Sequence, residues 1–187
     1  MLPRVSIIMG STSDMPVMEA ACKFFDEMEI PFEVNALSAH RTPAEVSDFA
    51  RNAQNRGIEV IIAAAGMAAA LPGVIAAETT LPVIGVPIKG SVLEGLDATF
   101  AIMQMPPGIP VATVAINGAL NAAVLAMQIM STGDSVLKEK VANYKKGLKN
   151  KIVKANKFHR QFEYQKHQHT KHNFQPHQQL NNRIFHQ

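Results

Sequence analysis

The chain has 187 residues, of which 47% are hydrophobic, enough apolar material for one folded domain with a substantial core. Its single cysteine, Cys22, excludes an internal disulfide, and one Cys and one His in residues 1–150 are too few for a structural zinc site. Residues 1–150 carry 11 Lys and Arg against 14 Asp and Glu, whereas residues 151–187 carry seven against one. The positive charge therefore lies outside the body, and we expect no nucleic-acid partner.

The sequence also lacks the signals of a membrane or exported protein. No apolar run approaches the roughly 18 residues that span a bilayer, because Gly, Pro and charged residues interrupt each one. The N-terminal MLPRVSIIMG has no basic region followed by a long apolar stretch, so we expect no signal peptide. A lone cysteine suits a reducing compartment, and we predict a cytoplasmic protein without a membrane partner.

Strand-like and helix-like segments alternate along the body. VSIIMG (5–10) is a short apolar run typical of a buried parallel strand, and it is followed by a helix whose apolar residues are Met18, Ala21, Cys22 and Phe25. A second strand at 32–38 precedes a helix that starts with a capping-box pattern, Thr42-Pro43-Ala44-Glu45, and that Gly57 is placed to end. Later strands are expected at 60–66, 82–88 and 111–116, and later helices at LPGVIAAET, 92–103, 118–131 and 134–155.

This alternation predicts an α/β fold. Five consecutive β-α units give a five-stranded parallel sheet with helices on both faces, a three-layer α/β/α sandwich for which we predict the flavodoxin-like strand order. The helix NGALNAAVLAMQIM is small or apolar around most of its circumference. It indicates self-association, unless the monomer buries the whole helix.

We divide the chain into a single domain, 1–155, and a C-terminal tail, 156–187. The tail holds six of the seven histidines and many Gln and Asn without sustained periodicity, so we expect it to be disordered. Histidine-rich tracts can bind metal, but these spacings form no defined ligand set, and we predict no metal site.

Ligands of open parallel sheets bind at the carboxyl ends of the strands, where three loops of this chain lie. In the first, GSTSD (10–14), backbone N–H groups, the hydroxyls of Ser11 and Ser13 and the positive end of a helix suit a phosphate. Asp14 suits sugar hydroxyls better, because a carboxylate repels phosphate. The alternative is an ordinary N-cap formed by Ser13 or Asp14.

The second loop, SAHRTP (38–43), holds the only histidine of the first 158 residues, His40. An imidazole can donate and accept protons near neutral pH, and the guanidinium of Arg41 offers a planar fork for phosphate or carboxylate. Alternatively, the His40 ring packs at a strand end while Arg41 pairs with a surface acid.

The third loop, AAAGMAAALPG (63–73), has small residues that allow a ligand to approach the backbone, and Pro72 is suited to start a helix. Tight helix–sheet packing would explain the same residues. We place QMPPGIP (104–110) at the border of the cleft and interpret Lys89 and Glu94 as surface residues.

Together, these loops resemble a known family. MGSTSD, SAHRTP, AAAGMAAALPG, PVIGVPI and QMPPGIPVATVAINGALNAA, in this order, resemble 5-(carboxyamino)imidazole ribonucleotide mutase, an enzyme of purine biosynthesis. The resemblance covers residues 4–155.

The resemblance implies an octamer of three-layer α/β domains with active sites at subunit junctions. It also implies that a carboxylate moves from the exocyclic nitrogen to a ring carbon of aminoimidazole ribonucleotide, without metal or organic cofactor. His40 would be the general acid and base, and Arg41 would contact the phosphate. The other substrate-binding residues would be Ser11, Ser13, Asp14, Ser38, Ala65, Gly66, Ala70 and Leu71.

One residue departs from the family's pattern. The third loop of the family often reads AAHLPG, whereas this chain has Ala70 in place of the histidine. Ala70 favours one alternative, a nucleotide-monophosphate-binding module that has lost catalysis. Two enzymatic alternatives also stay open: direct carboxylation of aminoimidazole ribonucleotide with free carbon dioxide, and a related carboxylase of a pyridine mononucleotide.

Overall fold

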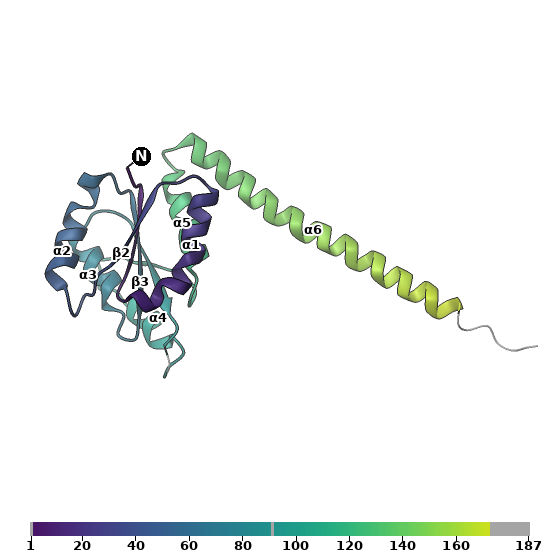
Figure 1. Cartoon of the computed structure of the whole chain (residues 1–187), viewed down its shortest axis with the longest axis horizontal. Coiled ribbons are helices and arrows are strands. Elements are labelled where there is room, and N and C mark those ends of the chain that lie inside the picture. The colour runs from purple at the N-terminus through teal and green to yellow at the C-terminus, as the bar shows by residue number, and fades with distance from the viewer. Residues whose placement is uncertain (1, 91, 173–187) are drawn as a thin grey trace, which may run out of the picture. The chain divides into compact units, whose positions relative to one another are not determined.

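The computed structural model describes residues 2–90 and 92–172, with side chains as far as residue 156 (Figure 1). The chain divides into two compact units, Met1–Val141 and Ala142–Gln187, which we describe separately. The first unit holds the whole sheet and all the loops considered above.

Five parallel strands form one sheet in the order β2-β1-β3-β4-β5. They are β1 (Val5–Met9), β2 (Phe32–Ala36), β3 (Val60–Gly66), β4 (Val83–Ile88) and β5 (Ala112–Thr113). β1 and β4 are buried along their whole length, as strands covered on both faces must be. The predicted α/β sandwich with flavodoxin-like strand order is confirmed.

The last strand is shorter than the predicted 111–116. Val114 donates its N–H to the Gly85 carbonyl at 3.2 Å, but the next residue of β4 on that side is Pro87, which has no N–H to donate back. The ladder therefore stops, and the Pro87 carbonyl instead accepts from Asn117 N at 2.8 Å.

Helices cover both faces of the sheet (Figure 1). α1 (Met15–Glu27) and α5 (Ala119–Met130) pack against each other on one face. α2 (Pro43–Asn52), α3 (Ala70–Glu78) and α4 (Leu96–Met103) share a second apolar core on the other. Two short 3-10 turns complete the set, η1 (Thr12–Asp14) and η2 (Gln54–Arg56), and the latter ends at Gly57 with φ of 94°, as the sequence predicts.

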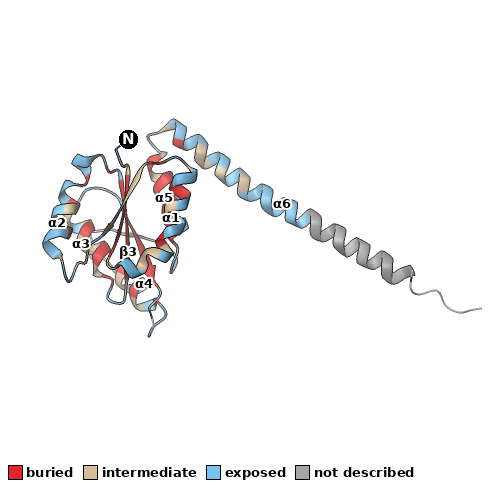
Figure 2. Cartoon of the chain, viewed as in Figure 1, coloured by how far each residue is buried: buried red, intermediate tan, exposed pale blue. Residues whose placement is uncertain are grey.

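The predicted apolar surface of α5 is mostly internal. Its alanines and methionines, among them Ala122, Ala126 and Met127, are buried inside the first unit, as the red colouring in Figure 2 shows. The sheet and α1 cover most of its circumference, and Leu120 is its one exposed large apolar residue, so this helix gives little support for self-association.

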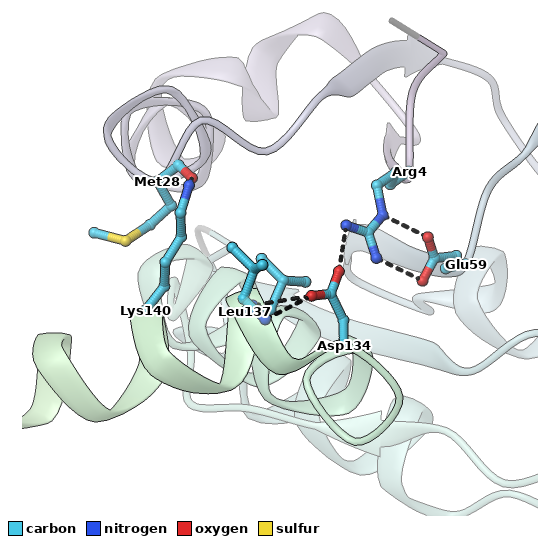
Figure 3. Close-up of polar contacts among 7 residues, drawn as sticks. Arg4, Met28, Glu59, Asp134, Leu137 and Lys140 are labelled. Carbon is cyan, nitrogen blue, oxygen red and sulfur yellow. Dashed lines mark hydrogen bonds and ion pairs between the residues drawn. The ribbon is translucent and has the colours of Figure 1, made fainter.

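The start of α6 (Ser135–His172) belongs to the first unit, where charged side chains hold its first turn (Figure 3). Asp134 accepts hydrogen bonds from Val136 N at 3.0 Å and Leu137 N at 3.1 Å, and its carboxylate also accepts from Arg4 Nη1 at 3.0 Å. Arg4 in turn holds Glu59. The first turn of α6 is thus linked by ion pairs to Arg4 and Glu59, which directly precede β1 and β3.

The helix α6 continues to His172, whereas we expected it to end near residue 155 and the tail to lack structure from residue 156. Lys, Gln and Glu, common in this stretch, are good helix formers, and no proline occurs before Pro176. The rest of the tail, 173–187, lies outside the described residues, and a domain boundary at 155 stays a prediction. None of the described helices is long and apolar enough to cross a membrane.

Candidate functional site

A cavity of about 580 Å³ opens at the carboxyl edge of the sheet. It is lined by the loops that follow β1, β2, β3 and β4, and all ten residues predicted for the site contribute to it. The three loops lie together because parallel strands end at the same edge, where the strand order reverses between β1 and β3.

The loop after β1 presents two hydroxyls and a carboxylate. Ser11 caps η1, and its Oγ accepts from Ser13 N at 3.3 Å and from the Ser13 hydroxyl at 2.8 Å. Asp14 precedes α1 but makes no side-chain cap hydrogen bond. Neither Ser13 nor Asp14 therefore caps α1 with its side chain, against the alternative above, and the Asp14 carboxylate lines the cavity and accepts from the Ser13 hydroxyl at 3.3 Å.

Asp14 is also electrostatically unusual. Burial raises the pKa of its carboxyl, and hydrogen bonds from the Ser13 hydroxyl and the Ser11 N–H oppose that rise. No cation among the described residues offsets the cost of ionising this partly buried carboxyl. A carboxyl with such a perturbed pKa in a cleft is typical of a functional site.

The loop after β2 is tied to the loop after β1 by Arg41. The guanidinium donates to the Gly10 carbonyl from Nη2 at 2.9 Å and to Ser38 Oγ from Nε at 3.3 Å. Among the described residues Arg41 pairs with no acid, and the exposed imidazole of His40 makes no hydrogen bond. The alternative of a packed histidine beside a surface ion pair is therefore wrong, and both side chains face the cavity.

Thr42 differs from the predicted capping box. Its hydroxyl accepts from Ser38 N at 2.9 Å and donates to the Ser38 carbonyl at 3.1 Å, so it does not cap α2. This closed loop, 38–42, holds His40 and Arg41 between two fixed ends.

The loop after β3 carries backbone strain at the cavity wall. Met67 and Ala69 have φ of 56° and 40°, in the left-handed region that side chains other than glycine rarely adopt. Leu71 is buried below the loop, and Ala65 and Gly66 lie at the strand end. α3 starts at Ala70 and not at Pro72, which places the small side chain of Ala70 in the cavity wall.

Strain of this kind costs on the order of 1–3 kcal/mol per residue and persists only where the surroundings enforce it. Helix–sheet packing alone does not require it, so the loop is better explained as a ligand-facing surface.

One charged residue of the cavity and one loop lie elsewhere than the sequence predicts. Lys89, interpreted as a surface residue, lines the cavity directly after β4 and forms an ion pair with Glu94. Its position at the end of a predicted strand was the available signal. Residues 104–110, expected at the border of the cleft, do not line it.

The described residues offer no metal centre, since nowhere do three His, Cys, Asp or Glu side chains come close enough together to hold an ion. The histidine side chains of the tail are not among the described ones.

Comparison with known proteins agrees with this geometry. The family described as AIR carboxylase matches residues 4–151, nearly the whole body. The chain belongs to the AIR carboxylase family. All four strand-end loops that line the cavity lie within the part that matches this family.

Several family members are named after one reaction. An N5-carboxyaminoimidazole ribonucleotide mutase from Pyrococcus abyssi is 56% identical over 148 residues, which are 79% of this chain and 85% of that protein. Another, from Thermotoga maritima, is 53% identical over 152 residues, 81% of this chain and 89% of that protein.

A phosphoribosylaminoimidazole carboxylase of Saccharomyces cerevisiae is 55% identical over 142 residues, 76% of this chain but only 25% of that longer protein. Among solved structures, PurE of Treponema denticola is 29% identical with a TM-score of 0.74, covering 81% of this chain and 95% of that one. The AIR carboxylase family thus shares both the sequence and the fold of this body.

Proposed function

We propose that this chain is an N5-carboxyaminoimidazole ribonucleotide mutase, with His40 as its general acid and base. The observation that carries the proposal is the convergence of the ten predicted residues on one cavity, where a free imidazole lies beside Arg41 and the serines of the first loop. The names of the relatives from Pyrococcus abyssi and Thermotoga maritima, which the chain covers to 85% and 89% of their length, support the reaction.

The polar loops suit the ribose-phosphate end of such a substrate. Arg41 has N–H groups left to donate after its bonds to Gly10 and Ser38, and the hydroxyls of Ser11, Ser13 and Ser38 line the same cavity. Asp14 lies beside them at the start of α1, where its carboxylate accepts from ribose hydroxyls. The first loop thereby contacts both the phosphate and the sugar, and Arg41 and Ser38 of the second loop contact the phosphate.

Carboxylate transfer needs one proton to move twice. As the bond between nitrogen and carboxylate breaks, carbon dioxide leaves and the exocyclic nitrogen must gain a proton. The ring carbon then attacks carbon dioxide, forms the new bond and loses its proton. A single imidazole that first donates and later accepts serves both steps, and His40 has no hydrogen bond among the described residues that would hold its nitrogens.

The apolar loop of residues 65–71 supplies the remaining requirement. Carbon dioxide has no charge, and a wall of Ala65, Gly66 and Ala70 retains it beside the ring without competing polar groups. Proximity then replaces a high concentration of the gas.

We also propose that the protein self-associates, as an octamer by family resemblance. The loop before α4 and the helix itself expose Val92, Leu93, Leu96, Phe100 and Met103, each more than half accessible. Beside them, Oδ1 of Asp97 is buried without a hydrogen-bond partner in the described part of the chain. An apolar surface with an unsatisfied acceptor at its edge suits a subunit interface. The cytoplasmic location stays a prediction.

Turnover of freshly prepared 5-(carboxyamino)imidazole ribonucleotide, followed by ultraviolet absorbance, tests the proposal. We expect the purified protein to form the carbon-carboxylated product and His40→Asn to bind the ribonucleotide without forming it. Ribonucleotide binding without turnover by the unmutated protein would contradict the proposal. Recovery of turnover by Ala70→His would then trace the loss to the missing imidazole.

A further inference from the structure

Besides Arg41, Lys89 is the second permanently charged cation among the residues that line the cavity. The proposed reaction gives it no role. It follows β4, while Arg41 bridges the loops after β1 and β2. Because β3 lies between β1 and β4, and neighbouring strands are about 4.8 Å apart, the strand ends that carry the two cations are roughly 10 Å or more apart. The cavity therefore has cationic groups at opposite ends.

The backbone of Lys89 is held in place while its side chain is not. Lys89 N donates to Asn117 Oδ1 at 2.9 Å, and Asn117 N donates to the Pro87 carbonyl at 2.8 Å. The Lys89 side chain, in contrast, is 56% exposed and is paired with the 62% exposed carboxylate of Glu94. Because its backbone is held and its side chain is free to change rotamer, the Lys89 ammonium can exchange one carboxylate partner for another.

The ion pair with Glu94 presents little obstacle to that exchange. Exposed pairs contribute little to stability, because water screens them and two long side chains lose freedom in forming them. A ligand carboxylate that the cavity already holds in place loses less freedom on pairing with Lys89 than the Glu94 side chain does.

We infer that Lys89 binds the carboxylate of the substrate, and that its ammonium is paired with Glu94 until the substrate binds. This inference rests on the proposed function. A carboxylated nucleoside monophosphate has its phosphate and its carboxylate at opposite ends of the molecule. Arg41 and the serines then bind the phosphate, and Lys89 binds the group that migrates. Lys89 is thus a specificity residue, which separates carboxylated from uncarboxylated ribonucleotide.

Calorimetric binding of two ligands tests this inference. The carbon-carboxylated product and aminoimidazole ribonucleotide share the phosphate, the ribose and the ring, and differ in the carboxylate. We expect Lys89→Met to weaken binding of the carboxylated ligand by about 10-fold, as for a lost charge-assisted hydrogen bond, and to leave the other within about 2-fold. Lys23→Met, which removes an exposed lysine paired with Glu19 on α1, is the matched control and should change neither.

A second variant tests the part assigned to Glu94. Glu94→Gln removes the competing carboxylate, so we expect the carboxylated ligand to bind about 2-fold or more tighter, with no change for aminoimidazole ribonucleotide. Weaker binding of the carboxylated ligand would contradict the exchange, since Glu94 would then be supporting the lysine.

The outcomes also separate this inference from the proposed function. Equal weakening of both ligands by Lys89→Met would make Lys89 a phosphate contact, and no weakening of either would make the pair a surface ion pair. Either result overturns the inference alone if the unmutated protein still converts its substrate. If the unmutated protein binds neither ribonucleotide, both proposals fall.

Discussion

Asp14 shows the conflict between stability and function in a single side chain. Its carboxyl is partly buried, which raises its pKa, and only two hydrogen bonds from neighbouring serines offset the burial. Above the pKa of the unfolded chain, the folded protein must hold a carboxylate that prefers water. Proteins keep a residue that lowers their stability in this way where its charge is needed to bind a ligand.

We therefore expect Asp14→Asn to raise the free energy of unfolding at pH 7, by less than about 1 kcal/mol because the group is partly solvated. The gain should disappear below about pH 4, where Asp14 is protonated in both states. Thermal unfolding from pH 3 to pH 8 measures it. The same variant should bind the ribonucleotide more weakly, and a loss of stability at neutral pH would contradict this reading of the site.

The positions of the site residues could be predicted from the sequence, but their local contacts could not. Short apolar strands mark where the carboxyl edge lies, and this places His40 and Arg41 correctly. The capping role of Thr42 was wrong because its hydroxyl can bond either to the helix or to the loop before it, and sequence alone does not rank the two. Lys89 was missed because a lysine after a strand is common on any surface.

At the scale of elements, the first turn of α6 depends on a charged cap. Hydrogen bonds from Leu137 N and from Arg4 hold the pKa of Asp134 below its ordinary value. Since its folded pKa lies below the unfolded one, the stability that Asp134 contributes is present at neutral pH and is lost as the pH falls through the folded pKa.

Asp134→Asn should therefore reduce the acid sensitivity of the protein. Asparagine can still accept from Val136 N and Leu137 N, but it lacks the charge that pairs with Arg4. We expect its thermal midpoint to lie below that of the unmutated protein at pH 7 and the two to converge below about pH 4. Glu19→Gln, in an exposed pair on α1, is the control and should show no such convergence. A constant difference between pH 3 and pH 7 would contradict the assigned role.

The end of a helix or strand could be predicted from the sequence where a single local residue determines it. Gly57 ends the second helical segment as predicted, because its left-handed φ suits glycine. The early end of β5 depends on Pro87 of a neighbouring strand, 25 residues before Ala112, so no local pattern in β5 itself predicts it.

At the scale of the whole molecule, the apolar surface lies on α4 and not on α5. Leu96, Phe100 and Met103 recur at helical spacing and form one exposed stripe, which the sequence did not distinguish from a core-facing one. The sequence pattern gives the stripe, but only the packing of α4 shows which side faces outward.

If this stripe is the subunit interface, a charge within it should dissociate the assembly. We expect Phe100→Glu to lower the mass measured by light scattering, while Leu2→Glu, at a site 74% exposed, leaves it unchanged. A monomeric unmutated protein would contradict self-association.

In the reaction that we propose, one cavity retains the carboxylate while it moves from nitrogen to carbon. The most direct measurement supplies substrate with a 13C-labelled carboxylate in excess unlabelled bicarbonate and determines the label in the product by mass spectrometry. Our account predicts that most product carries the label, because the apolar loop retains carbon dioxide beside the ring. Product labelled only to the level of the surrounding bicarbonate would contradict it and indicate a carboxylase that uses free carbon dioxide.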